Sequence, residues 1–391
     1  MEESIAIEKL RNSVEIATKK HHYIFLTFNF FCRYHNVEFV QAFYYESYCL
    51  KEYKTILELN DRFLNICDYT LYMDEYEWLK KRINLITVDN DMYKKINSGN
   101  VYVSTFRPGA WTVIKELLLA YYAPNYIKIL KNKSWINELC YVDLFAGSGI
   151  IELKDLENNY MGSPLIVKYG IPENFNRYYF FDNNDDNITQ LKTLVPDGDS
   201  HFFMGDSNVE IDKILPEISK SGAHSLIFID PYAMEIKFDT IRKLSNIGCD
   251  LMINVAAEEI YRAVKQYYSQ NWDTDKLDSF FGDDKWKTDL SNVSNDEQIS
   301  DYYANKIVGE TGKKKPVSTK IYKTFNGHHY YMLFTSTYGN GVKPPFFRII
   351  DTFNEKISRL DGNKIMSFIK HNIEKDDSLE RFNDDENGDM S

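Results

Sequence analysis

The sequence predicts a doubly wound α/β fold, with a mainly parallel sheet, preceded by a mainly helical N-terminal domain. From residue 101 onward, short apolar runs alternate with segments in which apolar residues recur at helical spacing. The run Leu226–Ile229 is apolar at every position, as in strands that are buried on both faces. Repeated strand–helix units of this kind form parallel sheets through right-handed crossovers.

The expected elements follow one another in a regular order. A first helix is expected at 112–129, where apolar residues share one face. Five strands are expected after it, at 140–145, 178–181, 201–204, 225–229 and 251–255. Between the strands, helix faces are predicted by three apolar sets, Ile188 with Leu191 and Leu194, Ile211 with Ile214 and Leu215, and Ile241 with Leu244. An antiparallel hairpin at 319–325 and 329–337 closes the pattern.

The first 98 residues differ from the rest of the chain. They contain neither Gly nor Pro, which favours helices joined by short polar turns. Aromatic residues are concentrated at positions 23–48. They could form either a base-stacking surface or an aromatic core. The prediction is an aromatic-rich helical domain of unknown role at 1–98, an α/β domain at 99–360 and an acidic, disordered tail at 361–391.

The composition is that of a soluble globular protein, with 43% hydrophobic and 27% charged residues. No apolar run reaches the roughly 20 residues that span a bilayer, and no signal-peptide pattern opens the sequence. The five cysteines form no CxxC pair, which disfavours disulfide scaffolds, zinc ribbons and iron–sulfur ligation. We therefore expect a cytoplasmic protein with no membrane association and no metal.

The formal charge of −12 argues against a protein that coats nucleic acid, because such affinity depends on neutralising phosphates. Half of this charge lies in residues 372–391, where eight acids accompany two basic residues. A segment of that composition cannot bury enough apolar surface to become ordered. The charge leaves open an enzyme that handles a single base.

Acids and glycines follow the expected strands. Asp143 ends the first strand and leads into a turn with Gly147 and Gly149, Asp182 ends the second strand, and Asp206 follows the third. Ligands of doubly wound sheets bind beyond the carboxyl ends of the strands, where a carboxylate can accept both hydroxyls of a ribose. Each feature alone is also explained by a tight turn or a helix cap. These three strand ends, with Asp230 at the end of the fourth strand, follow one another in order and together predict a ligand site.

A nicotinamide cofactor is disfavoured. A dehydrogenase requires GxGxxG opening a helix whose N-terminus meets a pyrophosphate. Here the turn runs from Phe145 to Ile151 without a third glycine, and the acid at Asp143 would repel phosphate.

The ordered set resembles the class I S-adenosylmethionine-dependent methyltransferases, which have a Rossmann-like sheet. The resemblance implies S-adenosyl-L-methionine as cofactor, with Asp143 near its amino group, Asp182 at the ribose and Asp206 at the adenine amino group. The predicted cofactor-binding residues are Asp143, Phe145, Gly147, Gly149, Asp182 and Asp206.

Within residues 105–357, six motifs more closely resemble the TcmP family, the three-Cys-motif partner proteins. They are Asp143–Gly149, Gly162–Leu165, Ile229–Tyr232, Asp250–Asn254, Leu277–Gly282 with Trp286, and Tyr330–Phe334. The resemblance implies a partner with radical S-adenosylmethionine-like iron–sulfur chemistry and a setting in antiviral (phage) defence or mobile elements. Ala233 stands where the family has glycine, and the first 100 residues lie outside the resemblance.

The turn Asp230-Pro231-Tyr232 is the predicted catalytic segment. Methyl transfer is an in-line displacement, so the protein mainly positions the nucleophile and handles its proton. Asp230 would accept hydrogen bonds from an amine, Pro231 would fix the turn, and Tyr232 would stack on a base. The turn resembles the Asp-Pro-Phe turn of tRNA guanine N2-methyltransferases, which implies a nucleobase amine in RNA or DNA as the methyl acceptor.

Three alternatives stay open. The turn could support the cofactor pocket without chemistry, or the acceptor could be a protein or small molecule. The chain could also be a catalytically silent subunit that binds the cofactor and assembles with a three-Cys-motif protein.

Basic stretches and a histidine pair are further candidates. Nucleic acid could contact Lys313–Lys315 with Lys320 and Lys323, or Lys80–Arg82, although such runs are more often solvated loops. For His328 and His329 we expect an exposed or satisfied pair, because no carboxylate or cysteine stands at ligand spacing.

Overall fold

The computed structural model describes residues 24–26, 42–44, 76–89, 108–154, 156, 158–195, 198–270, 274–313, 316–323, 329–336 and 345–373. The chain divides into two compact units, Met1–Asp74 and Glu75–Ser391. In the first unit, β1 (Ile24–Leu26) pairs antiparallel with β2 (Ala42–Tyr44). This ribbon lies where helices were predicted. The other predicted features of residues 1–75 lie outside the described residues.

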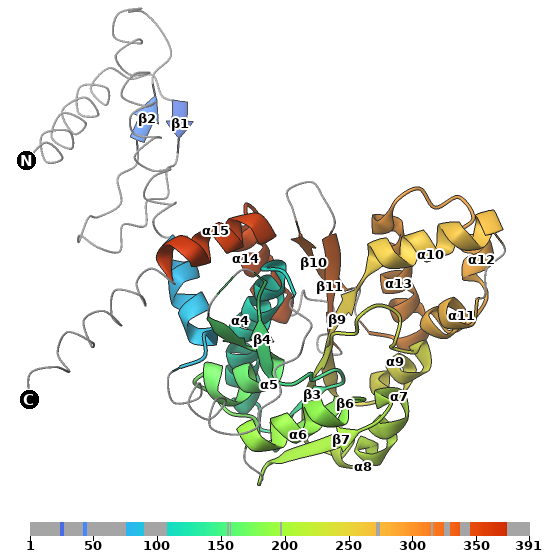
Figure 1. Cartoon of the computed structure of the whole chain (residues 1–391), viewed down its shortest axis with the longest axis horizontal. Coiled ribbons are helices and arrows are strands. Elements are labelled where there is room, and N and C mark those ends of the chain that lie inside the picture. Colours follow the sequence, from blue (N-terminus) through green and yellow to red (C-terminus); the bar gives the residue numbers. More distant parts are fainter. Residues whose placement is uncertain are drawn as a thin grey trace, which may run out of the picture. The chain divides into compact units, whose positions relative to one another are not determined.

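A seven-stranded sheet forms the centre of the second unit (Figure 1). Its spatial order is β10 (Val317–Tyr322), β11 (His329–Ser336), β9 (Cys249–Val255), β8 (Ala223–Ile229), β3 (Glu138–Asp143), β6 (Arg177–Asp182) and β7 (Ser200–Met204). Pairing is parallel from β9 to β7, whereas β11 is antiparallel to both its neighbours. The predicted doubly wound, Rossmann-like α/β sheet is confirmed.

The strand order reverses next to β3. From β3 the chain moves outward through β6 to β7, and it then returns to β8 and β9 on the other side of β3. A ligand of such a sheet binds outside the carboxyl ends at this switch point. Every residue of β9 is buried, including the polar Asp250 and Asn254, as expected of a strand that is covered on both faces.

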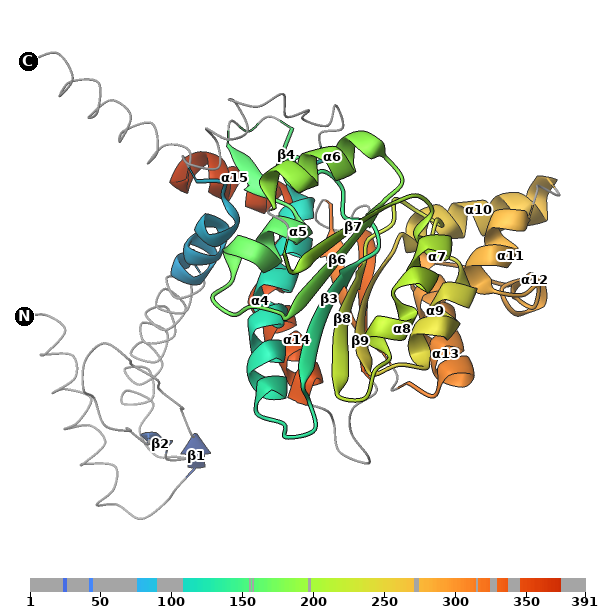
Figure 2. The same ribbon diagram turned by 90° about the horizontal axis from the view of Figure 1, so that it is seen from below.

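Helices cover both faces of the sheet (Figure 2). One face carries residues 76–86, α4 (Trp111–Lys131), α5 (Ser163–Leu165) with the π-helix Ile166–Gly170, α6 (Asp185–Leu194), α14 (Pro345–Ile357), α15 (Gly362–Asn372) and the hairpin β4 (Ile150–Glu152)–β5 (Asn159–Met161). The other carries α7 (Ser207–Glu210), the 3-10 turn Ile211–Lys213, α8 (Leu215–Ile218), α9 (Phe238–Ser245), α10 (Ala257–Gln270), α11 (Asp275–Phe281), α12 (Trp286–Asp289) and α13 (Asp296–Thr311). The helices therefore enclose the strands in two apolar cores.

Helix α4 matches the predicted helix at 112–129 and lies in the first core. Two of its tyrosines have polar partners there. The Tyr122 hydroxyl donates to Asp250 Oδ2 at 2.8 Å, and the Tyr126 hydroxyl lies 2.6 Å from His224 Nδ1. These bonds satisfy the buried hydroxyls and fix the helix against β8 and β9.

Two boundaries differ from those predicted. The division before Glu75 precedes the predicted boundary at 98/99, because Leu79, Ile83 and Ile86 are buried in the core of the α/β unit. Helix α15 occupies part of the predicted tail at 361–391, because Ile365 and Ile369 pack into the same core. The acidic residues 374–391 lie outside the described residues. Among the helices that the structure describes, none combines the length and apolar character needed to cross a membrane.

Candidate functional site

Four predicted site residues stand at the carboxyl ends of neighbouring strands. Asp143 ends β3 and Asp182 ends β6, while Asp206 follows β7 and Asp230 follows β8. Because β3 pairs in parallel with both β6 and β8, their ends lie side by side at the switch point of the sheet. These acids therefore lie along the carboxyl edge of the sheet.

The glycine turn after β3 is held by the end of β6. Asp182 Oδ2 accepts from the Gly147 amide at 2.9 Å. Both glycines have positive φ, 64° at Gly147 and 83° at Gly149. A Cβ on Gly149 would stand 2.8 Å from Leu191 Cδ2, so packing explains this glycine, whereas a Cβ on Gly147 would meet no described atom within 4 Å. The backbone at Gly147 is therefore accessible to a ligand.

Asp143 is fully buried beneath this turn. It accepts from the Tyr141 hydroxyl at 3.0 Å and from the Phe145 amide at 3.2 Å, and it also bonds the Ser163 side chain. Burial raises the pKa of the Asp143 carboxyl to about 7, against the opposing effect of these bonds. A cation bound beside Asp143 would favour its ionised form.

Asp182 and Asp206 have structural partners of their own. Asp182 Oδ1 accepts from the Asn184 amide at 2.8 Å and from Asn187 Nδ2 at 3.0 Å. Asp206 caps α7 by accepting from the Asn208 amide at 2.9 Å. A carboxylate has about four acceptor sites, so these bonds leave capacity for ligand hydroxyl or amino groups.

Asp230 is held from two directions. Lys115 Nζ on α4 lies 2.5 Å from Asp230 Oδ2, and Asn254 Nδ2 at the end of β9 donates to Asp230 Oδ1 at 2.7 Å. Pro231 is buried, whereas Tyr232 is 79% exposed. The predicted catalytic turn thus combines a fixed carboxylate with an aromatic ring in solvent.

Strand β11 places a tyrosine, Tyr330, beside Lys115 of α4. Lys115 Nζ lies 5.5 Å from the centroid of the Tyr330 ring, within range of a cation–π contact. The Tyr330 hydroxyl donates to the Trp111 carbonyl at 3.2 Å. Tyr330, from the Tyr330–Phe334 motif, therefore contacts both Trp111 of α4 and the lysine that holds Asp230.

Asn208 joins two of the strand-end loops. Its Nδ2 donates to Asp206 Oδ1 at 2.7 Å and to the Glu235 carbonyl at 2.8 Å. Its Oδ1 accepts from the Lys237 amide and from Thr240 Oγ1, each at 2.8 Å. This buried side chain ties the loop after β7 to the loop after β8.

Sequence reasoning missed four residues of this region. They are Lys115, Glu116, Asn208 and Asn254. The available signal was a pair of charges in the apolar helix 112–129 and the polar end of the Asp250–Asn254 motif. Neither signal identifies its partner, because each partner comes from a distant part of the sequence.

One residue of the predicted basic stretch Lys313–Lys315 has a structural role. Lys313 is buried, and its Nζ donates to the Cys249 carbonyl at 3.0 Å, which overturns its interpretation as part of a solvated basic loop or nucleic-acid patch. Lys314 and Lys315 lie outside the described residues. Lys323 lies 3.5 Å from Glu259, and Lys320 lies over the rings of Tyr322 and Tyr331.

His329 has a carboxylate partner. Its Nε2 lies 2.6 Å from Asp296 Oδ2 on α13, a contact that the spacing in sequence does not reveal. His328 lies outside the described residues. Within the described part of the chain, no group of three or more His, Cys, Asp or Glu side chains is arranged to hold a metal ion.

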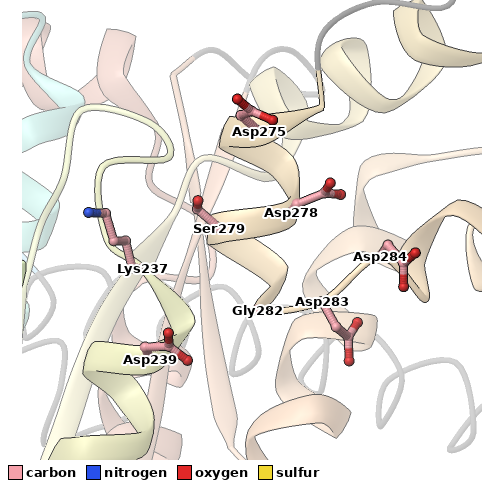
Figure 3. Close-up of a pocket in the computed structure, with 8 residues that line it drawn as sticks. All are labelled: Lys237, Asp239, Asp275, Asp278, Ser279, Gly282, Asp283 and Asp284. Atoms are coloured by element: carbon pink, nitrogen blue, oxygen red, sulfur yellow. The ribbon is translucent and has the colours of Figure 1, made fainter.

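A hollow of about 490 Å³ lies between α9 and α11, and Figure 3 shows its acidic lining. Asp278 accepts from Trp286 Nε1 at 2.7 Å and from Lys287 Nζ at 2.9 Å, and Asp283 pairs with Lys306 Nζ at 2.7 Å. These bonds explain the Leu277–Gly282 motif and its tryptophan as a structural unit. None of the predicted site residues lines this hollow.

No family model and no curated protein matches the sequence. Solved structures that resemble the chain include protein LPL1258 from Legionella pneumophila, at 14% identity and a TM-score of 0.39, covering 64% of this chain and 94% of that one. Trm1 from Pyrococcus horikoshii, in complex with S-adenosyl-L-methionine, has 8% identity and a TM-score of 0.34 over 73% of this chain and 76% of that one. The O-methyltransferase TomG from Streptomyces achromogenes, in complex with the same ligand, has 11% identity and a TM-score of 0.33 over 65% and 92%.

Proposed function

We propose that this protein is an S-adenosyl-L-methionine-dependent methyltransferase of the TcmP type. The observation that carries the proposal is the arrangement at the switch point of the sheet. There the Asp230 carboxylate, fixed by Lys115 and Asn254, directly follows β8, the strand that pairs with β3 and its Asp143. A cofactor site and an acceptor site would adjoin at that position.

The residues at this edge fit the cofactor. The open backbone at Gly147 admits a ligand, and a buried carboxylate oxygen of Glu116 lacks a partner among the described residues. Asp143 with the turn from Phe145 to Gly149 would hold the methionine end, Asp182 the ribose hydroxyls and Asp206 the adenine amino group. Bound there, the cofactor supplies an electrophilic methyl group on a sulfonium.

The chain itself would orient the acceptor and receive its proton. Lys115 and Asn254 each use one acceptor site on a different oxygen of Asp230, which leaves further lone pairs for an acceptor N–H. Pro231 fixes the turn from its buried position. Positioning of this kind is the main contribution that a protein makes to an in-line displacement.

We propose a nucleobase amine in RNA or DNA as the acceptor. The exposed Tyr232 ring supports this choice, because base–aromatic stacking is worth about 1–3 kcal/mol per base. A target base in a duplex would have to be extruded to reach Asp230. Antiviral defence or a mobile element as the setting, and a three-Cys-motif protein as the partner, belong to this proposal through the resemblance of the six motifs.

One observation favours a second candidate function. Both oxygens of Asp230 already have protein partners, which would suit a methyltransferase-like subunit that binds the cofactor without catalysis and assembles with a three-Cys-motif protein. Both functions include binding of the cofactor, but only the first includes methyl transfer.

Ligand binding and labelled methyl transfer test the proposal. At a concentration 100 times its Kd, S-adenosylmethionine would stabilise the fold by about 2.7 kcal/mol, which raises the Tm of a unit of roughly 300 residues by about 4 °C. Asp143→Ala and Asp182→Ala should remove this shift. Labelled methyl transfer to total tRNA, rRNA or DNA separates the enzyme from the silent subunit. If Asp230→Ala transfers label as fast as wild type, the role of Asp230 is wrong.

A further inference from the structure

Glu116 is a buried acid that the proposed chemistry does not yet use. It lies on α4, is 4% exposed, and its Oε2 has no hydrogen-bond partner among the described residues. Leaving a buried carboxyl oxygen unpaired costs free energy, so each such group requires an explanation. Ligand sites are one place where proteins keep unpaired groups of this kind.

The charges around Glu116 come from the neighbouring strands and from its own helix. Asp143 on β3 and Asp230 after β8 lie close enough to disfavour its ionisation, and Lys115 favours it. The hydroxyl groups of Tyr141 and Tyr330 also interact electrostatically with Glu116. Burial is the largest effect and raises the pKa of Glu116 well above its usual range. In the ligand-free protein burial therefore favours the neutral form of this carboxyl.

The local cation is already engaged. Lys115 Nζ lies 2.5 Å from Asp230 Oδ2, so it is paired with that acid. Two acids, Asp143 and Asp230, and one lysine thus act on Glu116, so a second positive group there would offset the excess of acids. A carboxylate oxygen accepts from N–H or O–H donors, and of the two positive groups of the cofactor only the ammonium offers one, because the sulfonium has no such hydrogen.

We propose that Glu116 binds the α-ammonium group of the cofactor's methionine end, together with Asp143. This assignment rests on the proposed function and adds a named ligand to it. It also makes cofactor affinity dependent on pH, because the free protein must lose a proton to bind. Affinity rises with pH as the free carboxyl ionises, and it falls again where the ligand's own ammonium group loses its proton.

Calorimetric titration of the full chain tests the assignment with three ligands. S-adenosylmethionine has the ammonium and the sulfonium, S-adenosylhomocysteine has the ammonium alone, and methylthioadenosine has neither. Glu116→Gln keeps the shape of the side chain and removes its charge. We expect this variant to weaken the first two ligands by about tenfold or more, as for loss of a charged hydrogen bond, and to leave methylthioadenosine unchanged.

Proton release gives a second readout that does not depend on activity. Titrations in buffers of different ionisation enthalpy should show more protons released by wild type than by Glu116→Gln. Asp250→Asn is the matched control, because Asp250 is also a fully buried acid but stands near the start of β9, at the opposite edge of the sheet. Thermal melts confirm that both variants fold. The control should bind all three ligands as wild type does.

The outcomes separate this inference from the proposed function. Equal affinities of Glu116→Gln and wild type for S-adenosylhomocysteine would overturn the assignment alone. A loss confined to S-adenosylmethionine would also overturn it, since Glu116 would then act on the sulfonium. Wild-type protein that binds none of the three ligands would overturn the proposed function itself.

Discussion

Lys115 Nζ lies 2.5 Å from Asp230 Oδ2, although the two residues are 115 positions apart in the chain. Both side chains are mostly buried, at 13% and 16% exposure. The contact joins α4 on one face of the sheet to the turn that follows β8. A partly buried pair loses more when one partner is removed than a surface pair does, because the other charge is left without compensation.

Lys115→Ala should therefore release the Asp230 carboxylate. We expect methyl transfer to fall by about 100-fold, the cost typical of a reacting group that is misplaced by about 1 Å. The Kd for methylthioadenosine should stay close to wild type, since this ligand lacks the ammonium group assigned to Glu116, whose ionised form Lys115 favours. Rates and binding measured side by side check this split.

Lys115→Arg provides the control for charge. A guanidinium retains the ion pair in altered geometry, so this variant should recover part of the rate. Wild-type rates in Lys115→Ala would show that the ion pair has no role in positioning.

Asn254 holds the other oxygen of Asp230, by donating from Nδ2 at 2.7 Å. Asn254→Asp replaces this donor with a second carboxylate, and two adjacent carboxylates cannot both ionise readily. One pKa of the pair is then raised in the folded state. Stability is present at low pH and is lost as pH rises through that raised value. Urea unfolding at pH 5 and pH 8 should show a steeper loss than in wild type.

Asn254→Ala is the matched control, because it removes the same hydrogen bond without adding a charge. Its pH dependence should parallel that of wild type. Equal slopes in Asn254→Asp and Asn254→Ala would contradict the expected coupling with Asp230.

The sheet and the strand-end acids could be predicted because their signals are local. Each strand is an apolar run, and Asp143 or Asp182 follows directly at its end. The contacts of Asp230 could not be predicted in this way. Lys115 looks like a solvent-facing charge in a helix, and only the tertiary fold brings it to the turn after β8.

The acidic composition of the C-terminal segment led us to miss helix α15. Ile365 and Ile369 recur at helical spacing, but the acidic residues that follow them dominate the reading of the C-terminal segment. Lys313 shows the converse, since it belongs to a basic run and yet is buried against the Cys249 carbonyl. Charge in sequence does not determine exposure when a backbone acceptor is available in the core.

Asp143 should make stability depend on pH. Burial raises its pKa from 3.8 to about 7, so the folded protein holds a proton that the unfolded chain releases at lower pH. The stability that this proton supplies is complete below pH 4 and is lost as pH rises through 7. The loss amounts to roughly 4 kcal/mol at about 1.4 kcal/mol per pKa unit.

Asp143→Asn removes this titration. Urea unfolding between pH 4 and pH 8 should therefore give a flatter stability profile than wild type. Because Glu116 and Asp250 also have raised pKa values, the difference between the two profiles is the quantity to compare. Parallel profiles would contradict the assignment of a raised pKa to Asp143.

Asn208 should be important for the loop after β8. Its side chain bonds Asp206, Thr240 and the backbone at Glu235 and Lys237. Asn208→Ala leaves several buried polar groups unpaired, and we expect a loss of about 2–3 kcal/mol. Hydrogen exchange at 231–237 should accelerate. The exposed Asn246→Ala is the control and should change stability by less than about 0.5 kcal/mol. Unchanged exchange in Asn208→Ala would show that other contacts hold the loop.

Tyr232 separates a nucleobase acceptor from other acceptors. Its ring is 79% exposed, so Tyr232→Ala should leave Tm and cofactor binding close to wild type. If the ring stacks on the target base, methyl transfer to RNA or DNA should weaken by about 1–3 kcal/mol, mainly through KM. Tyr232→Phe and Tyr232→Trp keep a stacking surface and should retain transfer. Equal transfer by Tyr232→Ala and Tyr232→Trp would remove the stacking argument and favour a protein or small-molecule acceptor.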